Sequence, residues 1–295
     1  MAEKKTYRLS GGLFDREEET SDVKRLFFLS VEGESTEPSY FINLNRVLKE
    51  LGVDDAALHV LRHRKDGLSS PEDVYLLLEE CRTIRDRRCE LLPLPVIDRL
   101  REEFSTEEIE KLMNGSSDVS VEKFKRFQDV LVNLGINLNY YEYLKSAPSA
   151  GDRFVVVIDR DVRSHTRECL DEIIRKCRDN AYLCCLTNPC FEFWLLLHLA
   201  DVDGLLEPDE LQKIQDNVRV SKRHTYVSGL VSRLARHYKH INEHTFDRYY
   251  GPYLGKATKN AQKFAVTEEA VLDEVGTTMP RLIKEIFNGR LPAGD

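Results

Sequence analysis

The sequence has no apolar stretch of membrane-spanning length, and the residues from Met1 to Lys5 lack the apolar core of a signal peptide. These absences predict a cytoplasmic protein that does not associate with membranes. No CxxC pair occurs among the seven cysteines, which are odd in number. Cys190 and His198 could ligate zinc, but buried thiols in a reducing cytosol are the favoured interpretation.

The chain also lacks an excess of positive charge. Its formal net charge is −8, with 32% charged and 41% hydrophobic residues, as expected of a globular protein with a charged surface. This balance argues against indiscriminate binding to polyanions. A local basic patch or bound metal ions would still permit contact with nucleic acid. The length of 295 residues suits one large domain with insertions, or two domains.

The most informative stretch is the apolar run 154–158, which leads directly into Asp159 and Asp161. A β-branched run of this length that ends in charge is typical of a buried strand, most often in a parallel sheet. Ligands bind such sheets at the carboxyl ends of the strands. Because two neighbouring carboxylates repel each other unless a cation or a proton lies between them, the pair predicts a divalent-metal site.

Two further apolar runs end in polar turns, 26–31 before Glu32 and 182–187 before Asn188, and 58–61 is a shorter candidate strand. Helical periodicity follows Pro38, recurs over 166–177, and gives way to an almost wholly apolar helix over 191–199. The alternation predicts an α/β fold with a mostly parallel sheet flanked by helices, whose polar turns share one edge.

The domain organisation is predicted from changes in composition. Residues 1–22 read as a mobile leader and 23–200 as the α/β domain. A helical insertion is expected within it at about 82–139, because that segment contains no strand-like run. Amphipathic helices predict an α-helical C-terminal region over 201–295.

The candidate metal ligands are oxygen donors. Glu32, Asp159 and Asp161 form the expected set for Mg²⁺ or Mn²⁺. A second ion could use Glu34, Glu37 or Glu192, which would permit two-metal phosphodiester cleavage.

Each acid also has a structural interpretation. The aspartate pair could form a solvated turn in which Asp161 caps the next helix, and Glu32 could cap the helix after Pro38. Glu34 and Glu37 suit the first turn of that helix, where acids complement the helix dipole. Glu192 could pair with an arginine.

Basic residues form the second group of candidates. Arg160 and Arg163 could bind a phosphate or simply pair with the neighbouring aspartates. Lys256, Lys259 and Lys263 are spaced for one helix face and could contact a nucleic-acid backbone, or form an ordinary solvated face. The basic segment 63–65 carries the same two alternatives.

The acidic motifs resemble the Toprim fold of topoisomerases, primases and certain nucleases. Taken together, residues 31–41, 157–161 and 188–198 more closely resemble the RloB family, which is regarded as Toprim-related and is associated with bacterial restriction and anti-phage loci. Residues 277–283 resemble a family pattern more weakly. Each motif alone is unspecific, but the ordered set is specific.

This resemblance implies a Toprim-like fold and a Mg²⁺- or Mn²⁺-dependent nuclease in anti-phage defence. It assigns Glu32 to a metal-ligand or acid/base role, Asp159 and Asp161 to the metal, and Glu37 to a second acid. The implied partners are RNA, with tRNA as one candidate, or DNA, together with a defence ATPase, a restriction-system protein or a second copy of the chain. The long insertion is expected to shape a substrate cleft or a partner surface.

Two other functions stay open. The core could belong to a non-catalytic adaptor or sensor that binds a nucleotide, nucleic acid or a defence ATPase. A phosphoacceptor domain also places aspartates at strand ends, but the sequence shows no strand ends with the threonine and lysine that would accompany them.

Overall fold

The computed structural model describes residues 25–61, 70–85, 94–113, 119–133, 151–237 and 239–290. The predicted leader 1–22 and the basic segment 63–65 lie outside the described residues. Within this part of the chain, no helix combines the length and the apolar character that crossing a bilayer requires.

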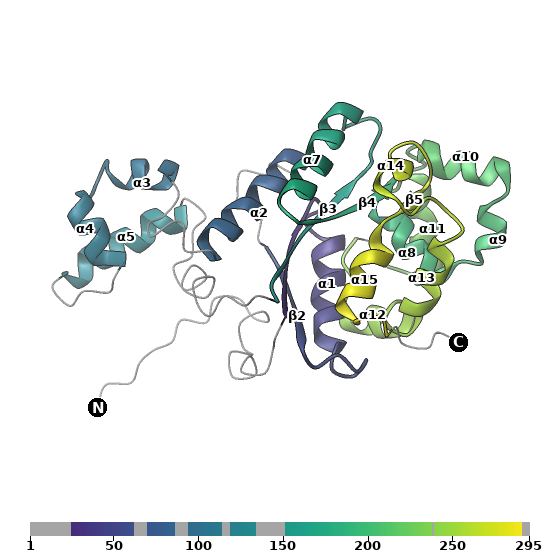
Figure 1. Ribbon diagram of the computed structural model, residues 1–295, viewed down its shortest axis with the longest axis horizontal. Coiled ribbons are helices and arrows are strands. Elements are labelled where there is room, and N and C mark those ends of the chain that lie inside the picture. The colour runs from purple at the N-terminus through teal and green to yellow at the C-terminus, as the bar shows by residue number, and fades with distance from the viewer. Residues whose placement is uncertain are drawn as a thin grey trace.

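A mixed, mostly parallel sheet forms the centre of the molecule (Figure 1). Its strand order is β2-β1-β3-β4-β5, with β5 antiparallel to β4 and every other pair parallel. The strands are β1 (Arg25–Val31), β2 (Ala56–Val60), β3 (Arg153–Asp159), β4 (Leu183–Asn188) and β5 (Gly276–Thr277). The α/β class and the four parallel strands predicted from the sequence are confirmed.

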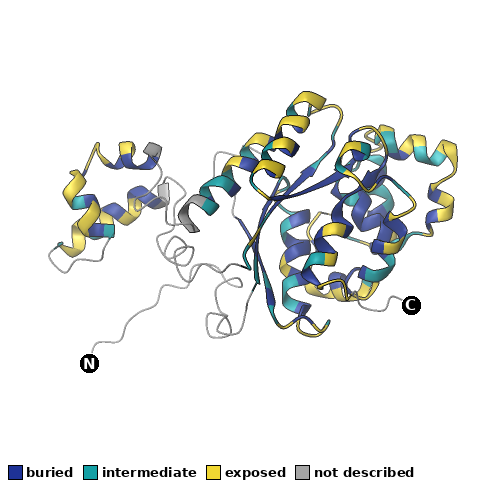
Figure 2. Ribbon diagram, in the orientation of Figure 1, coloured by how far each residue is buried: buried dark blue, intermediate teal, exposed yellow. Residues whose placement is uncertain are grey.

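Alternate residues of the central strands point into two separate cores, as the period of two in a strand requires. Phe28, Val156 and Ile158 face helices α2 (Pro71–Arg85) and α7 (Arg167–Asp179). The intervening residues face α1 (Thr36–Val47), α8 (Phe191–Leu199) and helices from the C-terminal region. Figure 2 shows buried residues on both sides of the sheet, which explains why the strands read as continuous apolar runs.

The C-terminal region contributes to this fold rather than forming a separate helical addition. It supplies β5 to the sheet, and Thr278 Oγ1 accepts a hydrogen bond from the Leu186 amide of β4 (2.8 Å). Its helices pack on the α1 and α8 side of the sheet, except the short helix 268–271, whose Val271 lies in the core on the α2 and α7 side. They are α9 (Val202–Leu205), α10 (Pro208–Asp216), α11 (Tyr226–Ala235), α12 (Glu243–Tyr249), the 3-10 turn η2 (Gly251–Tyr253), α13 (Leu254–Ala261), α14 (Glu268–Val271) and α15 (Met279–Ile286).

Beyond the end of α2, the described part of the expected insertion contains three short helices, α3 (Leu94–Leu100), α4 (Thr106–Met113) and α5 (Val121–Asn133). No strand occurs in the described part of it, as predicted. Figure 1 shows these helices as a small bundle set apart from the sheet. Its own contacts include Phe104 and Phe127, whose ring centroids lie 5.6 Å apart in an edge-to-face arrangement.

Candidate functional site

Two acids meet where β1 and β3 end. The strands are parallel, and their last paired residues are Val31 and Val157. Glu32 and Asp159, which follow this pair, therefore emerge at the same sheet edge. The Asp159 amide donates a hydrogen bond to Glu32 Oε2 (3.0 Å). The structure therefore places these two predicted site residues in direct contact, at the edge where parallel sheets bind ligands.

The Asp159 carboxylate also lies at the start of α8. Its Oδ1 atom accepts a hydrogen bond from the Phe191 amide (2.8 Å), one of the helix N–H groups that has no partner within the helix. The turn between β4 and α8, with a cis peptide bond between Asn188 and Pro189, brings α8 to this position. Asp159 thus provides a partner for a free N–H group of the helix terminus and also lines the site.

Two further acids surround Asp159. Glu37 is buried in the first turn of α1, and Glu192 lies in the first turn of α8. Burial, and then the negative charges of Glu37, Glu32 and Glu192, raise the pKa of Asp159 well above its usual range. Burial and the charge of Glu192 raise the pKa of Glu37 to about 8. The site therefore concentrates more negative charge than its carboxylates can hold without a proton or a cation.

The alternative in which an arginine neutralises Glu192 is wrong for the described residues, because none of their basic side chains forms an ion pair with it. Glu34 is exposed in the turn before α1 and does not line the site.

Asp161 lines the same site but has a structural role as well. Its Oδ1 accepts from the Arg163 amide (3.0 Å), and its Oδ2 accepts from the Ser164 hydroxyl (2.8 Å). These bonds close the turn that follows β3, so Asp161 organises this turn and does not cap α7, whose N-cap is Thr166. Its carboxylate remains at the margin of the acidic cluster.

His165 is a site residue that the sequence analysis missed. Its Nε2 atom lies 2.8 Å from Glu32 Oε1, and the side chain is only 9% exposed. The hydrogen bond to Glu32 raises the pKa of His165 and so favours the imidazolium form. The only sequence signal for His165 was its position shortly after Asp159 and Asp161, because it lies in the turn that begins at Asp161.

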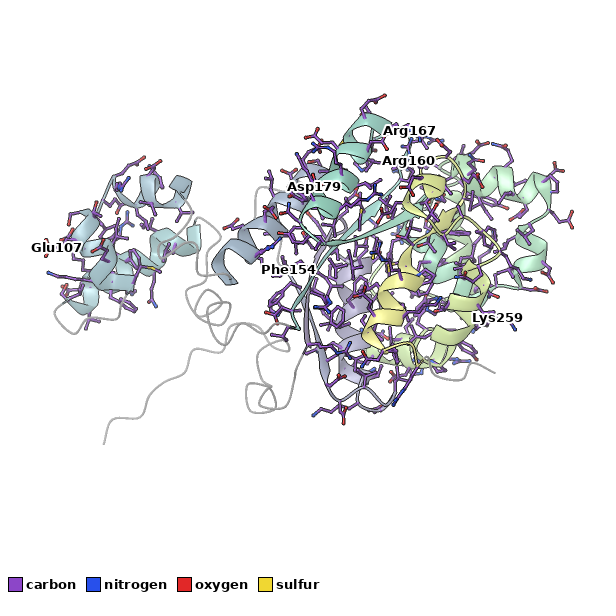
Figure 3. All side chains as sticks on the ribbon, viewed as in Figure 1. Glu107, Phe154, Arg160, Arg167, Asp179 and Lys259 are labelled. Atoms are coloured by element: carbon purple, nitrogen blue, oxygen red, sulfur yellow. The ribbon has the colours of Figure 1, made fainter. Side chains whose placement is uncertain are left out.

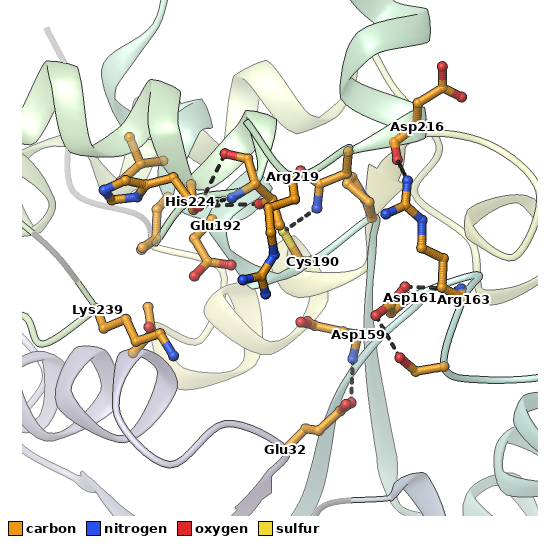
Figure 4. Close-up of a pocket in the computed structure, with 18 of the residues that line it drawn as sticks. Glu32, Asp159, Asp161, Arg163, Cys190, Glu192, Asp216, Arg219, His224 and Lys239 are labelled. Atoms are coloured by element: carbon orange, nitrogen blue, oxygen red, sulfur yellow. Dashed lines mark hydrogen bonds between the residues drawn. The ribbon is translucent and has the colours of Figure 1, made fainter. Parts of the chain in front are cut away.

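A pocket of about 470 Å³ opens at this edge of the sheet. Figure 4 shows Glu32 and Asp159 on one side of it, with Arg219 and Lys239 reaching towards them. The acids that line the pocket are Glu32, Asp159, Asp161, Glu192 and Asp216. The pocket is also lined by a group of basic residues, called the basic wall below, which the sequence analysis did not identify: Arg219, Arg223, His224 and Lys239.

The two arginines beside the aspartates differ in placement. Arg163 lines the pocket, and its guanidinium donates to the Asp216 carbonyl oxygen (3.1 Å). Arg160 is buried and donates to the carbonyl oxygens of Leu272 (2.9 Å) and His165 (3.0 Å). It fixes the loop that carries His165, so the expectation of a phosphate contact from Arg160 is wrong.

Lys256 and Lys259 lie on α13 and Lys263 follows its end, away from the acidic pocket. Figure 3 shows Lys259 far from Arg160, which follows β3, and none of the three predicted lysines lines the pocket. Lys263 forms an ion pair with Asp203, and the Lys256 ammonium lies over the Tyr253 ring. The structure thus favours the solvated-face interpretation for Lys256, Lys259 and Lys263.

The zinc alternative is also wrong. Cys190 Sγ accepts from the Asn217 amide, whereas both ring nitrogens of His198 are engaged by Tyr40 and Trp194 in the core. The two side chains therefore do not share a site.

The acidic cluster fits a hard divalent cation in its chemistry. All its donors are carboxylate oxygens, which Mg²⁺ and Mn²⁺ prefer, and their mutual repulsion would fall when a cation bound. No three His, Cys, Asp or Glu side chains of the described residues form a ready-made metal group. Cation binding would therefore draw the carboxylates closer together.

These features define an α/β protein with an acidic pocket at the carboxyl edge of a mostly parallel sheet. The chain belongs to the RloB-like protein family, whose model matches residues 27–286 and so includes most of β1, the strands β2 to β5 and the whole pocket. Neither the comparison with curated proteins nor that with solved structures found a match.

Proposed function

We propose that the protein is a Mg²⁺- or Mn²⁺-dependent nuclease of the Toprim type that hydrolyses phosphodiester bonds. The observation that carries this proposal is the pairing, in one pocket, of a crowded carboxylate cluster with a basic wall. Such a cluster suits divalent cations, and arginine and lysine suit the phosphates that those cations would contact. Similarity to the RloB family supports a role in anti-phage defence.

The residues have distinct roles in this scheme. Glu32 and Asp159 would hold the cation, with Glu37 and Glu192 available for a second one, and the cation would polarise the phosphate and supply a metal-bound water. His165 orients Glu32 through its hydrogen bond, as residues behind a metal ligand commonly do. Arg163 and the basic wall would bind the phosphates on either side of the scissile bond.

The test is cleavage by the purified protein of tRNA, single-stranded DNA and plasmid DNA, with Mg²⁺, Mn²⁺ or EDTA. Asp159→Asn keeps the oxygen that accepts the Phe191 amide but removes the charge. We expect it to lower the rate by roughly a hundredfold or more, since even changes behind a metal ligand cost 10–100-fold. Asp171→Asn, on the exposed face of α7, is the control and should cut at the wild-type rate. Equal cleavage by Asp159→Asn would overturn the assignment.

A non-catalytic adaptor that binds nucleic acid is the second candidate. Glu32 and Asp159 already accept hydrogen bonds from groups of the protein itself. This observation favours the adaptor, because carboxylates with a purely structural role would form the same bonds. Calorimetric titration with Mn²⁺ separates the two. Binding that Asp159→Asn abolishes supports the nuclease, and absence of Mn²⁺ binding to the wild type supports the adaptor.

A further inference from the structure

The segment between α10 and α11 forms a short hairpin over the pocket. Arg219 and Thr225 pair in an antiparallel bridge, and the Val220 amide donates to the His224 carbonyl oxygen (2.9 Å). Residues 218–225 are called the basic hairpin below. Its sequence, Val-Arg-Val-Ser-Lys-Arg-His-Thr, holds three of the four residues of the basic wall.

Asn217 holds the basic hairpin against the acidic site. It adopts a left-handed backbone conformation (φ 39°), which ends α10 and turns the chain towards the pocket. Its side-chain oxygen accepts from the Val227 amide (3.0 Å), and its amide group donates to Cys190 Sγ (3.4 Å) at the start of α8. One residue therefore ties both ends of the hairpin to the helix that contacts Asp159.

Among the described residues, no carboxylate forms an ion pair with the two arginines of the basic hairpin. Arg219 donates only to the carbonyl oxygen of Lys222 (3.3 Å). Within the described ranges, neither Arg219 nor Arg223 forms an ion pair, whereas exposed arginines elsewhere, such as Arg126 and Arg178, pair with glutamates. In a chain of net charge −8, two unpaired guanidinium groups at one pocket indicate an anionic ligand.

The size of the pocket limits what this ligand can be. A volume of about 470 Å³ falls within the range of sites that enclose one small molecule, and so accommodates about one nucleotide. The acids lie inside the pocket. A whole nucleotide of a duplex could enter the pocket only by leaving the base stack. A single strand presents such a nucleotide without that cost.

We propose that the basic hairpin clamps the phosphates of a single-stranded nucleic acid, one nucleotide of which enters the pocket. Arg219 and Arg223 are the phosphate-binding residues, since a guanidinium can bind phosphate through two parallel hydrogen bonds. The role of this clamp in a reaction rests on the proposed function. Binding of a single strand by the clamp requires neither metal nor cleavage.

The experiment measures fluorescence anisotropy of labelled RNA and DNA single strands of about 12 nucleotides, and of the matching duplex, in EDTA. The double variant Arg219→Ala/Arg223→Ala is compared with Lys222→Ala, which removes a lysine of the same hairpin that does not line the pocket. We expect the wild type to bind single strands about tenfold or more tighter than duplex. The double variant should lose about tenfold or more, and Lys222→Ala less than about twofold.

Salt dependence gives a second readout. Loss of two phosphate contacts should reduce the slope of log K against log salt concentration by about 1.4, at about 0.7 per contact for a single strand. An unchanged melting temperature of the double variant shows that the fold persists. A free mononucleotide at millimolar concentration serves as competitor.

Equal binding of single strands by the wild type and the double variant would overturn the clamp. Duplex binding as tight as single-strand binding would overturn the substrate class, and so would full competition by the free mononucleotide. If single strands bind through Arg219 and Arg223 but no substrate is cut with metal, the proposed nuclease fails while the clamp stands. If the double variant cuts substrate with metal as fast as the wild type, the clamp fails while the proposed nuclease stands.

Discussion

At the scale of single residues, the acidic site depends on a glycine. The carboxylate of Glu37 lies against Gly33, and a Cβ atom at position 33 would overlap it. Glu37 is only 6% exposed, so the carboxyl group has little room to move towards water. Gly33 is therefore required by the buried acid and not by backbone geometry.

We expect Gly33→Ala to lower the free energy of unfolding by about 1–3 kcal/mol, the usual cost of forcing extra volume into a packed site. Gly204→Ala, in the short helix α9, is the matched control, because its Cβ would meet no atom within 4 Å. It should be neutral or stabilising by up to about 1 kcal/mol. The measurement is urea-induced unfolding at pH 7.

A double-mutant cycle tests the physical reason. In the background of Glu37→Ala the overlapping carboxylate is absent, so Gly33→Ala should cost close to nothing there. An equal cost in both backgrounds would show that position 33 is constrained by something other than Glu37.

The residues that the sequence identified are those attached directly to strand ends. Glu32 and Asp159 follow apolar runs, and parallel pairing was enough to bring them together. His165 and Arg219 reach the site through a turn and a hairpin whose paths depend on tertiary contacts, so no periodicity marked them. Arg160 was misassigned because adjacency in sequence to Asp159 does not fix the direction of a side chain: successive residues at a strand end point to opposite faces.

At the scale of elements, α8 shows how a wholly apolar helix accommodates polar atoms. The Trp194 indole N–H donates to the Tyr40 hydroxyl (3.0 Å), which leaves the hydroxyl hydrogen for His198 Nε2 (3.2 Å). His198 Nδ1 then donates to the Trp194 carbonyl oxygen (2.9 Å). This closed network needs a neutral imidazole, and burial lowers the pKa of His198 to about 3.

This network predicts a specific loss of stability in acid. Between pH 6.5 and about 3 the unfolded chain binds a proton at His198 that the folded chain does not, so the free energy of unfolding falls as pH falls. The slope contributed by this residue approaches about 1.4 kcal/mol per pH unit. His198→Gln lacks the titrating group, so its deficit relative to the wild type should shrink between pH 6.5 and pH 4.5 in urea unfolding.

His244→Gln, at an exposed position of α12, is the control for this measurement and should leave the pH profile of the wild type unchanged. A stability difference between His198→Gln and wild type that stays constant over this range would contradict a neutral, buried His198.

Elements with strong periodicity were predicted within a few residues of their bounds, including the four parallel strands, α7 and α8. The strand β5 was not, because its two residues carry no periodicity. It forms because Gly276 approaches the backbone of Ala265 so closely that a Cβ atom could not fit, and because the Thr277 and Thr187 hydroxyls share a hydrogen bond (2.8 Å). Such pairing depends on the tertiary fold.

At the scale of the whole molecule, the pocket belongs to the sheet and to the C-terminal region. Its lining residues come from positions 32–36 and from positions 159–239, and none comes from α3, α4 or α5. The expectation that the insertion shapes the substrate cleft is therefore wrong for its described part, and a partner surface stays a prediction. The described part of the predicted insertion is helical, but the position of its bundle in the molecule depends on contacts that periodicity does not record.

The aromatic packing within the small bundle of α3, α4 and α5 predicts that this bundle can unfold locally. Phe127 is fully buried and packs edge-to-face on Phe104 within the small bundle, so Phe127→Ala should destabilise α3 to α5 by about 3–5 kcal/mol. Hydrogen exchange should then rise in residues 94–133 and stay at the wild-type level in β1, β3 and α8. Phe246→Ala removes an equally buried ring from α12. It should raise exchange in β1, β3 and α8 and leave residues 94–133 at the wild-type level. Faster exchange across the sheet in Phe127→Ala would show instead that the bundle and the sheet fold as one cooperative unit.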